Sequence, residues 1–307
     1  MDEGSHVGPE RAVEALRWAA AQVTAGDPAR GAAPPKPTPA EHRALPAALA
    51  REHLDSLLVS GHAETGLDAL QATGMLDVWL PEVASLVGFG DGEWRHKDVW
   101  KHTKQVVRQA VPRLAVRWGA LLHDVGKPKT RRIEPTGEVH FFGHAEVGAA
   151  MFRKRIATRL GLDGPLGERV HYLILHHLRA SQYDETWTDS AVRRFAREMG
   201  DGLTDLLDLS RADITTKRPH RRKQGLRLIS ELAERIRSVQ ELDARIPALP
   251  KGLGTAIAAA FGIPPSRRIG DIKCELEARC EAGTLDPGKD SEFYVEYLRR
   301  HADELDL

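Results

Sequence analysis

This sequence has few cysteines, few aromatic residues, no excess of either charge and no long apolar run. Its only two cysteines, Cys274 and Cys280, cannot build a disulfide framework or a zinc ribbon. Lysine plus arginine and aspartate plus glutamate number 44 each, so the whole chain offers no basic field to nucleic acid. No stretch approaches the roughly 18 apolar residues of a membrane helix, and the N-terminus, with Asp2, Glu3 and His6, does not resemble a signal peptide. We therefore expect a cytoplasmic protein without a membrane segment, in which any RNA contact is confined to a local patch.

The apolar residues recur with a helical period over most of the chain, and 41% hydrophobic residues are enough to build a core. A short helix is predicted over residues 8–25. The proline-rich residues 26–40 then predict a linker, so the first 40 residues are expected to be an appendage or partly disordered. Only residues 129–142 have a convincing strand pattern, and the turn signal at 134–137 predicts a small hairpin. The predicted fold class is all-α with one β-hairpin.

The most informative stretch is residues 121–127, where His123 and Asp124 are adjacent at the end of an apolar helical run and Lys127 follows. Histidine and aspartate are both ligands for divalent metals. Neighbouring residues on a helix point about 100° apart, so this pair can share one ion only at the mouth of a cleft. The alternative is a plain helix C-terminus at which a cationic histidine pairs with the last carbonyl groups. The stretch alone is compatible with either interpretation.

Other metal-ligand types fall on the buried faces or at the ends of further predicted helices. An aspartate on an apolar stripe, such as Asp213, is costly unless it is paired or bound to a cation. A joint site with nitrogen and oxygen ligands only favours Mg, Mn, Fe, Co, Ni or Zn. Six such groups suffice for one or two ions, with Asp124 as the natural bridge. His176 is the rival of His177, which we prefer because it shares the apolar stripe of its helix. The predicted ligands are His102, His123, Asp124, His144, His177 and Asp213.

Basic residues follow the central stretch and could bind substrate phosphate. Lys127 would bring a fixed positive charge to the mouth of the same cleft. The predicted hairpin would bring Lys129, Arg131 and Arg132 near the site, although a solvated basic edge is an equally good interpretation. A second basic cluster, at residues 217–223, precedes a long helix predicted from residue 226 and could contact RNA. These residues are candidates for substrate binding.

The motifs together resemble the HD-domain superfamily of metal-dependent phosphohydrolases. They are more specifically similar to the HD and tail portion of bacterial CCA-adding tRNA nucleotidyltransferases. The nucleotidyltransferase head is not found here, and residues 1–44 are too short to hold it, so we do not expect this chain to add CCA. The stretches that carry the resemblance are residues 98–103, 118–128, 142–149, 187–195 and 210–213, with a neck-like segment at 66–76 and a tail-like segment at 261–270.

The resemblance implies an HD-domain helical bundle flanked by helical neck-like and tail-like segments. Its expected parts are an N-terminal helix and linker at 1–44, the neck-like segment at 45–92, the HD domain at 93–224 and the tail at 225–307. It implies His102, His123, Asp124 and Asp213 as metal ligands, and His144 and His177 as those that complete a second metal. The implied activity is hydrolysis of 2′,3′-cyclic nucleotides, 2′-nucleotides or phosphomonoesters, with His123, Asp124 and Lys127 catalytic.

Two alternative functions remain open from the sequence. One is a di-iron oxygenase of the HD type, which also uses six histidine and aspartate ligands. The other is a module that binds RNA or tRNA and carries an inactive HD site. The expected partner of the enzyme is a nucleotide or an RNA-terminal phosphate, with possible tRNA contact, and the sequence does not indicate an oligomeric state.

Overall fold

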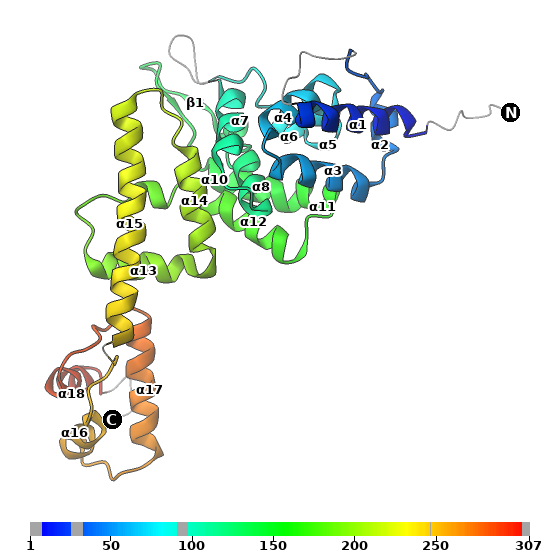
Figure 1. The fold of residues 1–307 in the computed structure, drawn as a ribbon. Helices are drawn as coiled ribbons and strands as arrows, with labels where there is room; N and C mark the ends of the chain where they lie inside the picture. The colour runs from blue at the N-terminus through cyan, green and yellow to red at the C-terminus, as the bar shows by residue number, and fades with distance from the viewer. Residues whose placement is uncertain (1–7, 26–32, 91–97, 246, 303–307) are drawn as a thin grey trace. The chain divides into compact units, whose positions relative to one another are not determined.

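The computed structural model describes residues 8–25, 33–90, 98–245 and 247–302, and these residues are mostly helical (Figure 1). Residues 26–32 of the expected linker and residues 91–97 lie outside the described residues. The chain separates into two compact units. The first comprises Met1–Tyr183 with Asp201–Ile229, and the second comprises Asp184–Gly200 with Ser230–Leu307.

The N-terminal part of the first unit is a group of short helices. Helix α1 packs against α3 and α4 rather than standing apart as an appendage. The reason is its stripe of small apolar residues, in which Ala12 and Leu16 are almost fully buried. The helices of this part are α1 (Glu10–Ala25), α2 (Pro39–Arg43), α3 (Ala47–Val59), α4 (Ala63–Ala72), α5 (Met75–Trp79) and α6 (Pro81–Ala84).

The core of the first unit lies around α8 (Leu114–Leu122). This helix is buried over most of its length and packs against α3, α7, α12 and α14. A helix that is apolar around most of its surface packs in the interior of a protein. The position of α8 therefore sets how deeply the residues that follow it are buried. The other helices here are α7 (Val99–Gln109), α9 (Lys127–Thr130), α10 (His144–Met151), a π-helical turn η1 (Phe152–Ile156), α11 (Ala157–Leu160), α12 (Gly164–His176), the 3₁₀ turns η2 (Ala180–Gln182) and η3 (Gly200–Gly202), and α14 (Leu203–Asp213).

The expected hairpin is present as β1 (Arg132–Ile133) and β2 (Val139–His140). The strands are antiparallel, with Arg132 opposite His140 and Ile133 opposite Val139. Gly137 has a φ of 83°, which the tight turn between the strands requires. The strand pattern was predicted to begin at residue 129, but residues 127–130 form α9, because Pro128 suits the first turn of a helix.

The second unit has its own core, formed by helices near the C-terminus. Leu253, Leu276, Tyr294 and Leu298 are almost fully buried in it. Helix α15 begins at Pro219, earlier than the predicted residue 226, so most of the basic cluster is helical. The helices that contribute to this unit are α13 (Asp189–Met199), α15 (Pro219–Arg245, from residue 230), α16 (Leu253–Phe261), α17 (Arg267–Glu281) and α18 (Ser291–Arg300).

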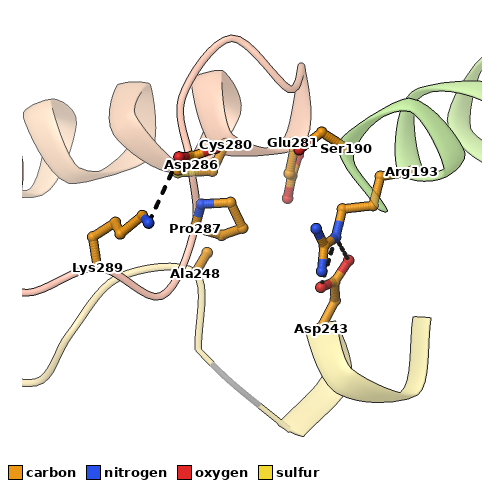
Figure 2. A pocket seen from close by; sticks show the side chains of 9 residues that line it. All are labelled: Ser190, Arg193, Asp243, Ala248, Cys280, Glu281, Asp286, Pro287 and Lys289. Atoms are coloured by element: carbon orange, nitrogen blue, oxygen red, sulfur yellow. Dashed lines mark hydrogen bonds and ion pairs between the residues drawn. The ribbon is translucent and has the colours of Figure 1, made fainter. Parts of the chain in front are cut away.

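A cavity of about 480 Å³ lies within this second unit, beside the end of α17 (Figure 2). Four of its five charged side chains form two ion pairs. Arg193 Nε donates to both carboxylate oxygens of Asp243, at 3.0 and 2.9 Å, and Lys289 lies 3.7 Å from Asp286. The thiol of Cys280 is buried and that of Cys274 is exposed, and both are free. This cavity contains no histidine and no built arrangement of metal ligands.

Among the helices that the structure describes, none combines the length and the apolar character that crossing a lipid bilayer requires.

Candidate metal centre

A cavity of about 270 Å³ in the first unit brings together all six residues predicted as metal ligands. Four of them are buried, whereas His102 and Asp213 are partly exposed at its mouth. The cavity is lined by His102, His123, Asp124, His144, His177 and Asp213, together with Lys127, Val99, Phe141 and Leu178.

Most of these side chains occupy the ends of helices. His123 and His177 are the C-cap residues of α8 and α12, and Asp213 is the last residue of α14. The C-terminus of a helix carries partial negative charge from its unpaired carbonyl groups. Three such ends meet at a cavity that also holds two carboxylates, so the site favours a cation on electrostatic grounds.

The six residues form two groups, each with ligand atoms within 4.8 Å of one another. In the first group, His102 Nε2 lies 3.0 Å from Asp213 Oδ1 and 3.2 Å from His123 Nε2. In the second, His144 Nε2 lies 3.1 Å from His177 Nε2 and 3.6 Å from Asp124 Oδ1. Ligands that share an ion at bond lengths of about 2.1 Å are about 3.0 to 3.4 Å apart in octahedral or tetrahedral geometry. The separations of 3.0 to 3.2 Å fall in this range, and those of 3.6 Å for His144–Asp124 and 3.7 Å for His123–Asp213 are a few tenths of an ångström longer.

Asp124 connects the two groups. Its Oδ1 faces His144, while its Oδ2 lies 3.2 Å from His123 Nε2 and 3.6 Å from His102 Nε2. Lys127 Nζ donates to the same Oδ2 at 2.6 Å. A carboxylate with one oxygen toward each group has the geometry of a bridging ligand, and Lys127 balances part of its charge.

The histidine rings are held in a single tautomer by backbone carbonyls. Nδ1 of His123, His144 and His177 donates to the carbonyl oxygen three residues earlier, at 2.8 to 2.9 Å. A carbonyl only accepts, so Nδ1 carries the hydrogen and Nε2 of the neutral ring presents a lone pair to the cavity. The same arrangement orients histidines that bind metals. His102 Nδ1 lies 2.9 Å from the hydroxyl of Thr215, which can donate or accept, so this contact orients the ring without selecting its tautomer.

The His144–His177 pair tests whether the donors fit a metal. Burial lowers the pKa of His144, and burial together with the charge of His123 lowers the pKa of His177 to about 4. Both rings are therefore neutral at pH 7, and two lone pairs face each other across 3.1 Å. No hydrogen bond can form between them in this tautomer, and a cation between them removes the repulsion. The donor set of this group therefore fits a divalent metal.

The carboxylates also require a positive charge. Burial opposes ionisation of Asp124 and Asp213, but His123, together with a hydrogen bond from His102 at Asp213, lowers the pKa of both carboxyls well below the usual value. Burial alone would lower the pKa of His123, yet the adjacent Asp124 raises it overall. The raised pKa favours a positive charge on His123 beside these carboxylates, the same kind of compensation that a divalent ion would provide.

The residues predicted to bind substrate divide into two sets. Lys127 lines the cavity, with its Nζ 5.6 Å from the centre of the Phe141 ring. Lys129, Arg131 and Arg132 are exposed and are not part of the cavity lining. The structure thus places Lys127 in the lining of the cavity and the other three basic residues on the surface, outside that lining.

Two features of the site were not found from the sequence. One is Thr215, which orients His102 and lies just after Asp213 on the chain. The other is Phe141, which lines the cavity with its ring and accepts from His144 with its carbonyl. For Phe141 the sequence offers a usable signal, a histidine at a helix end with a carbonyl acceptor three residues earlier. Nothing local in the sequence indicates Thr215. His176, the rival ligand, packs against Tyr172 and does not line the cavity.

Acidification is expected to destabilise the metal-free protein between about pH 6.5 and pH 4. His177 has a pKa of about 4 in the fold against 6.5 in a model compound, so in this window the unfolded chain binds more protons. Stability therefore falls as the pH falls, by up to about 3 kcal/mol for this group at about 1.4 kcal/mol per pKa unit. The pKa of His123 is raised, so its contribution to stability is lost mainly as the pH rises above this window.

Urea denaturation of the chelator-treated protein at several pH values measures this slope. His177→Gln should flatten the curve, whereas His176→Gln, the same change one residue earlier and outside the cavity, should keep the wild-type curve. Equal slopes in the two variants would show that burial of His177 does not set the pH dependence.

Comparison with known proteins identifies the central part of the chain. Residues 99–218 match the family model described as HD domain. The chain is 36% identical over 244 residues to the A-adding tRNA nucleotidyltransferase of Deinococcus radiodurans, covering 76% of this chain and 54% of that protein. It is 34% identical over 268 residues to the CC-adding tRNA nucleotidyltransferase of Thermus thermophilus, covering 85% of this chain and 59% of that protein. A multifunctional CCA protein of Pasteurella multocida is 29% identical over 154 residues, which is 47% of this chain and 36% of that protein.

The chain thus spans a little over half the length of the first two of these relatives. The matched family region begins at the start of α7 and includes every residue of the two histidine and aspartate groups. Residues 99–218 of this chain are an HD domain, and the chain is homologous over most of its length to bacterial tRNA nucleotidyltransferases.

Proposed function

We propose that the protein is a metal-dependent phosphohydrolase that acts on nucleotide phosphoesters, as a 2′,3′-cyclic phosphodiesterase, a 2′-nucleotidase or a phosphomonoesterase. The observation that carries this proposal is the pair of histidine and aspartate groups joined by Asp124 in one cavity. The donors are nitrogen and oxygen only, which suits Mg, Mn, Ni, Co, Fe or Zn. We propose one or two such ions, held by His102, His123 and Asp213 and by Asp124, His144 and His177.

A bound divalent ion supplies Lewis acidity, which lowers the pKa of water to about 7 and polarises a phosphoryl oxygen. The protein itself positions the reactants. Histidine rings locked through Nδ1 keep their lone pairs aimed at one place, so no reorganisation is needed during the reaction. Asp124 and Asp213 provide negative charge that retains the ions. Lys127, at the edge of the cavity, contributes a fixed positive charge toward the phosphoryl group.

Water is the nucleophile in this proposal. The described lining of the cavity contains no serine, threonine or cysteine that could attack phosphorus. The hydroxyl of Thr215, the nearest candidate, is engaged with His102 Nδ1 at 2.9 Å. A covalent enzyme intermediate is therefore not required, and the histidine and aspartate groups are better suited to activating water.

The proposed partner is a nucleotide or an RNA-terminal phosphate, with RNA contact at the basic cluster of residues 217–223. Lys217, Arg218, Arg221, Arg222 and Lys223 are all exposed. No acidic residue occurs between residues 214 and 230, so this surface is locally positive although the chain as a whole is neutral. The relatives named as tRNA nucleotidyltransferases make an RNA end a reasonable substrate. We expect the protein to act in the cytoplasm, in agreement with its free thiols.

Metal removal tests the proposal. Metal analysis of the purified protein should find a divalent ion, and a screen of 2′,3′-cyclic nucleotides, 2′-nucleotides and phosphomonoesters should find turnover. Treatment with a chelator should lower this turnover at least about a hundredfold, and one of Mg, Mn, Ni, Co, Fe or Zn should restore it. Iron with oxygen consumption and no hydrolysis would instead indicate an oxygenase, and RNA binding without turnover would indicate an inactive site.

A further inference from the structure

The hairpin beside the cavity exposes an aromatic ring that the fold does not explain. Phe142 has 75% of its surface exposed, the highest value among the described large hydrophobic residues that are exposed. A phenylalanine in water gains nothing from its surroundings, whereas burying it would contribute about 2 kcal/mol. A ring that stays exposed to solvent in this way is expected to be covered by a partner outside the chain.

A second ring holds Phe142 in place. The imidazole of His140 stacks on it, with centroids 5.0 Å apart and planes 13° from parallel. The pairing of β1 and β2 sets Arg132 opposite His140, and residues directly opposite in an antiparallel pair share a face. Arg132 is exposed, so a cation lies on the same face of the hairpin as the stacked rings. We call Arg132, His140 and Phe142 the hairpin platform.

The platform adjoins the metal centre through its neighbour on the chain. Phe141 precedes Phe142, lines the cavity and lies beneath Lys127 Nζ. A ligand whose phosphate enters the cavity past Lys127 would therefore have its next group close to the platform. Consecutive residues are only about 3.8 Å apart along the backbone.

The charge around the platform is mainly positive. Lys129 and Arg131 are exposed on its approach, and the guanidinium of Arg131 lies 5.7 Å from the ring of Phe89. The acidic residues of the hairpin, Glu134 and Glu138, lie at its turn, and Glu138 is 3.9 Å from His140 of the platform. An exposed flat ring flanked by cations complements a base with its phosphates, because bases stack on aromatic rings and phosphates pair with lysine and arginine.

We propose that the hairpin platform stacks a nucleobase of an unpaired nucleotide at a nucleic-acid end, next to the phosphate that enters the metal centre. This inference rests on the proposed function, since it assigns the substrate class of that site as a single-stranded end rather than a small phosphoester without a base. Phe142 is the specificity-determining residue, and it acts on the base rather than on the reacting phosphate.

Binding measured without turnover tests the platform separately from hydrolysis. The probe is a fluorescent single-stranded oligoribonucleotide of about ten residues, compared with an abasic oligomer of equal length and charge. Phe142→Ala should weaken binding of the base-bearing oligomer about tenfold and leave the abasic oligomer unchanged. Phe142→Trp should bind the base-bearing oligomer within about twofold of wild type. Phe142→Leu, which keeps apolar bulk without a ring, should behave like the alanine variant.

The remaining outcomes would each overturn the inference. One is that Phe142→Ala weakens binding of both oligomers equally, and another is that Phe142→Leu binds the base-bearing oligomer as tightly as wild type. The third is that Phe142→Ala weakens binding of a blunt duplex by the same factor, because the bases of a duplex cannot stack on the ring. Because no arm requires hydrolysis, a protein that binds as expected but has no phosphohydrolase activity would refute the proposed function alone.

Discussion

Replacing Asp124 by asparagine is expected to lower kcat/KM for the phosphoester substrate by at least about a thousandfold, or about 4 kcal/mol of transition-state stabilisation. Asp124 faces both histidine groups, with Oδ2 3.2 Å from His123 Nε2 and Oδ1 3.6 Å from His144 Nε2. Asparagine keeps the shape of the side chain but removes its negative charge. Its amide NH₂ also points a hydrogen-bond donor toward one of the two ligand groups, where aspartate has an acceptor. Both groups therefore lose part of their affinity for metal at once.

The fold should survive this change, because the ammonium of Lys127 loses its partner at a position that solvent can reach, with 21% of the side chain exposed. Kinetics, calorimetric titration with Mn²⁺ and circular dichroism together separate loss of function from unfolding. Asp77→Asn makes the same substitution at an exposed position of α5 in the same unit and should change none of these measurements. A folded Asp124→Asn protein with wild-type turnover would refute the assignment of this cavity as the active site.

Replacing Gly126 by alanine is expected to cost about 3 kcal/mol of stability and to lower turnover about a hundredfold. Gly126 has φ −77° and ψ −21°, which any residue adopts, so its backbone does not require glycine. Its surroundings do, because a Cβ here would lie 2.1 Å from the carbonyl oxygen of His144 and 2.9 Å from the nitrogen of Gly148. The N-terminal turn of α10 would have to move away.

That turn carries His144, so a steric change at Gly126 should be detected at the metal centre. Thermal or urea denaturation measures the stability, and Mn²⁺ titration shows whether affinity falls with it. Gly61→Ala is the matched control, since a Cβ at Gly61 meets nothing within 4 Å, and it should leave stability and turnover near wild type. If Gly126→Ala lost stability but kept full metal affinity and turnover, the close approach would serve packing only and His144 would not be essential.

Much of the fold follows from local signals. Aspartate is a favoured N-cap, and the side chain of Asp98 accepts from Lys101 N at 3.1 Å at the start of α7, the helix that carries His102. Thr188 caps α13 in the same way. The turn signal at residues 134–137 specified the hairpin, and the mainly helical class is confirmed. These features depend on contacts between residues a few positions apart, which is why a single sequence is enough to predict them.

Local signals were less accurate where tertiary contacts compete. Residues 129 and 130 were assigned to the hairpin but belong to α9, and α1 was assigned to a segment that is an appendage or partly disordered but packs against α4. Gly164, a residue type that often follows the end of a helix, begins α12 with a φ of 61°. Helix α9 follows from Pro128, a local signal, whereas α1 is held by its packing against α3 and α4.

The sequence by itself determined which residue types were available for the site, because histidine and aspartate on apolar helical stripes are costly unless they bind or pair with something. The tertiary structure alone decided how they combine. It placed His177 in the cavity and His176 against Tyr172. It also paired Lys127 with Asp124 and left Arg132 exposed on the surface. The physical reason is that helical periodicity fixes the face of a residue relative to its own helix axis, whereas the meeting of helix ends more than a hundred residues apart depends on how the helices pack around α8.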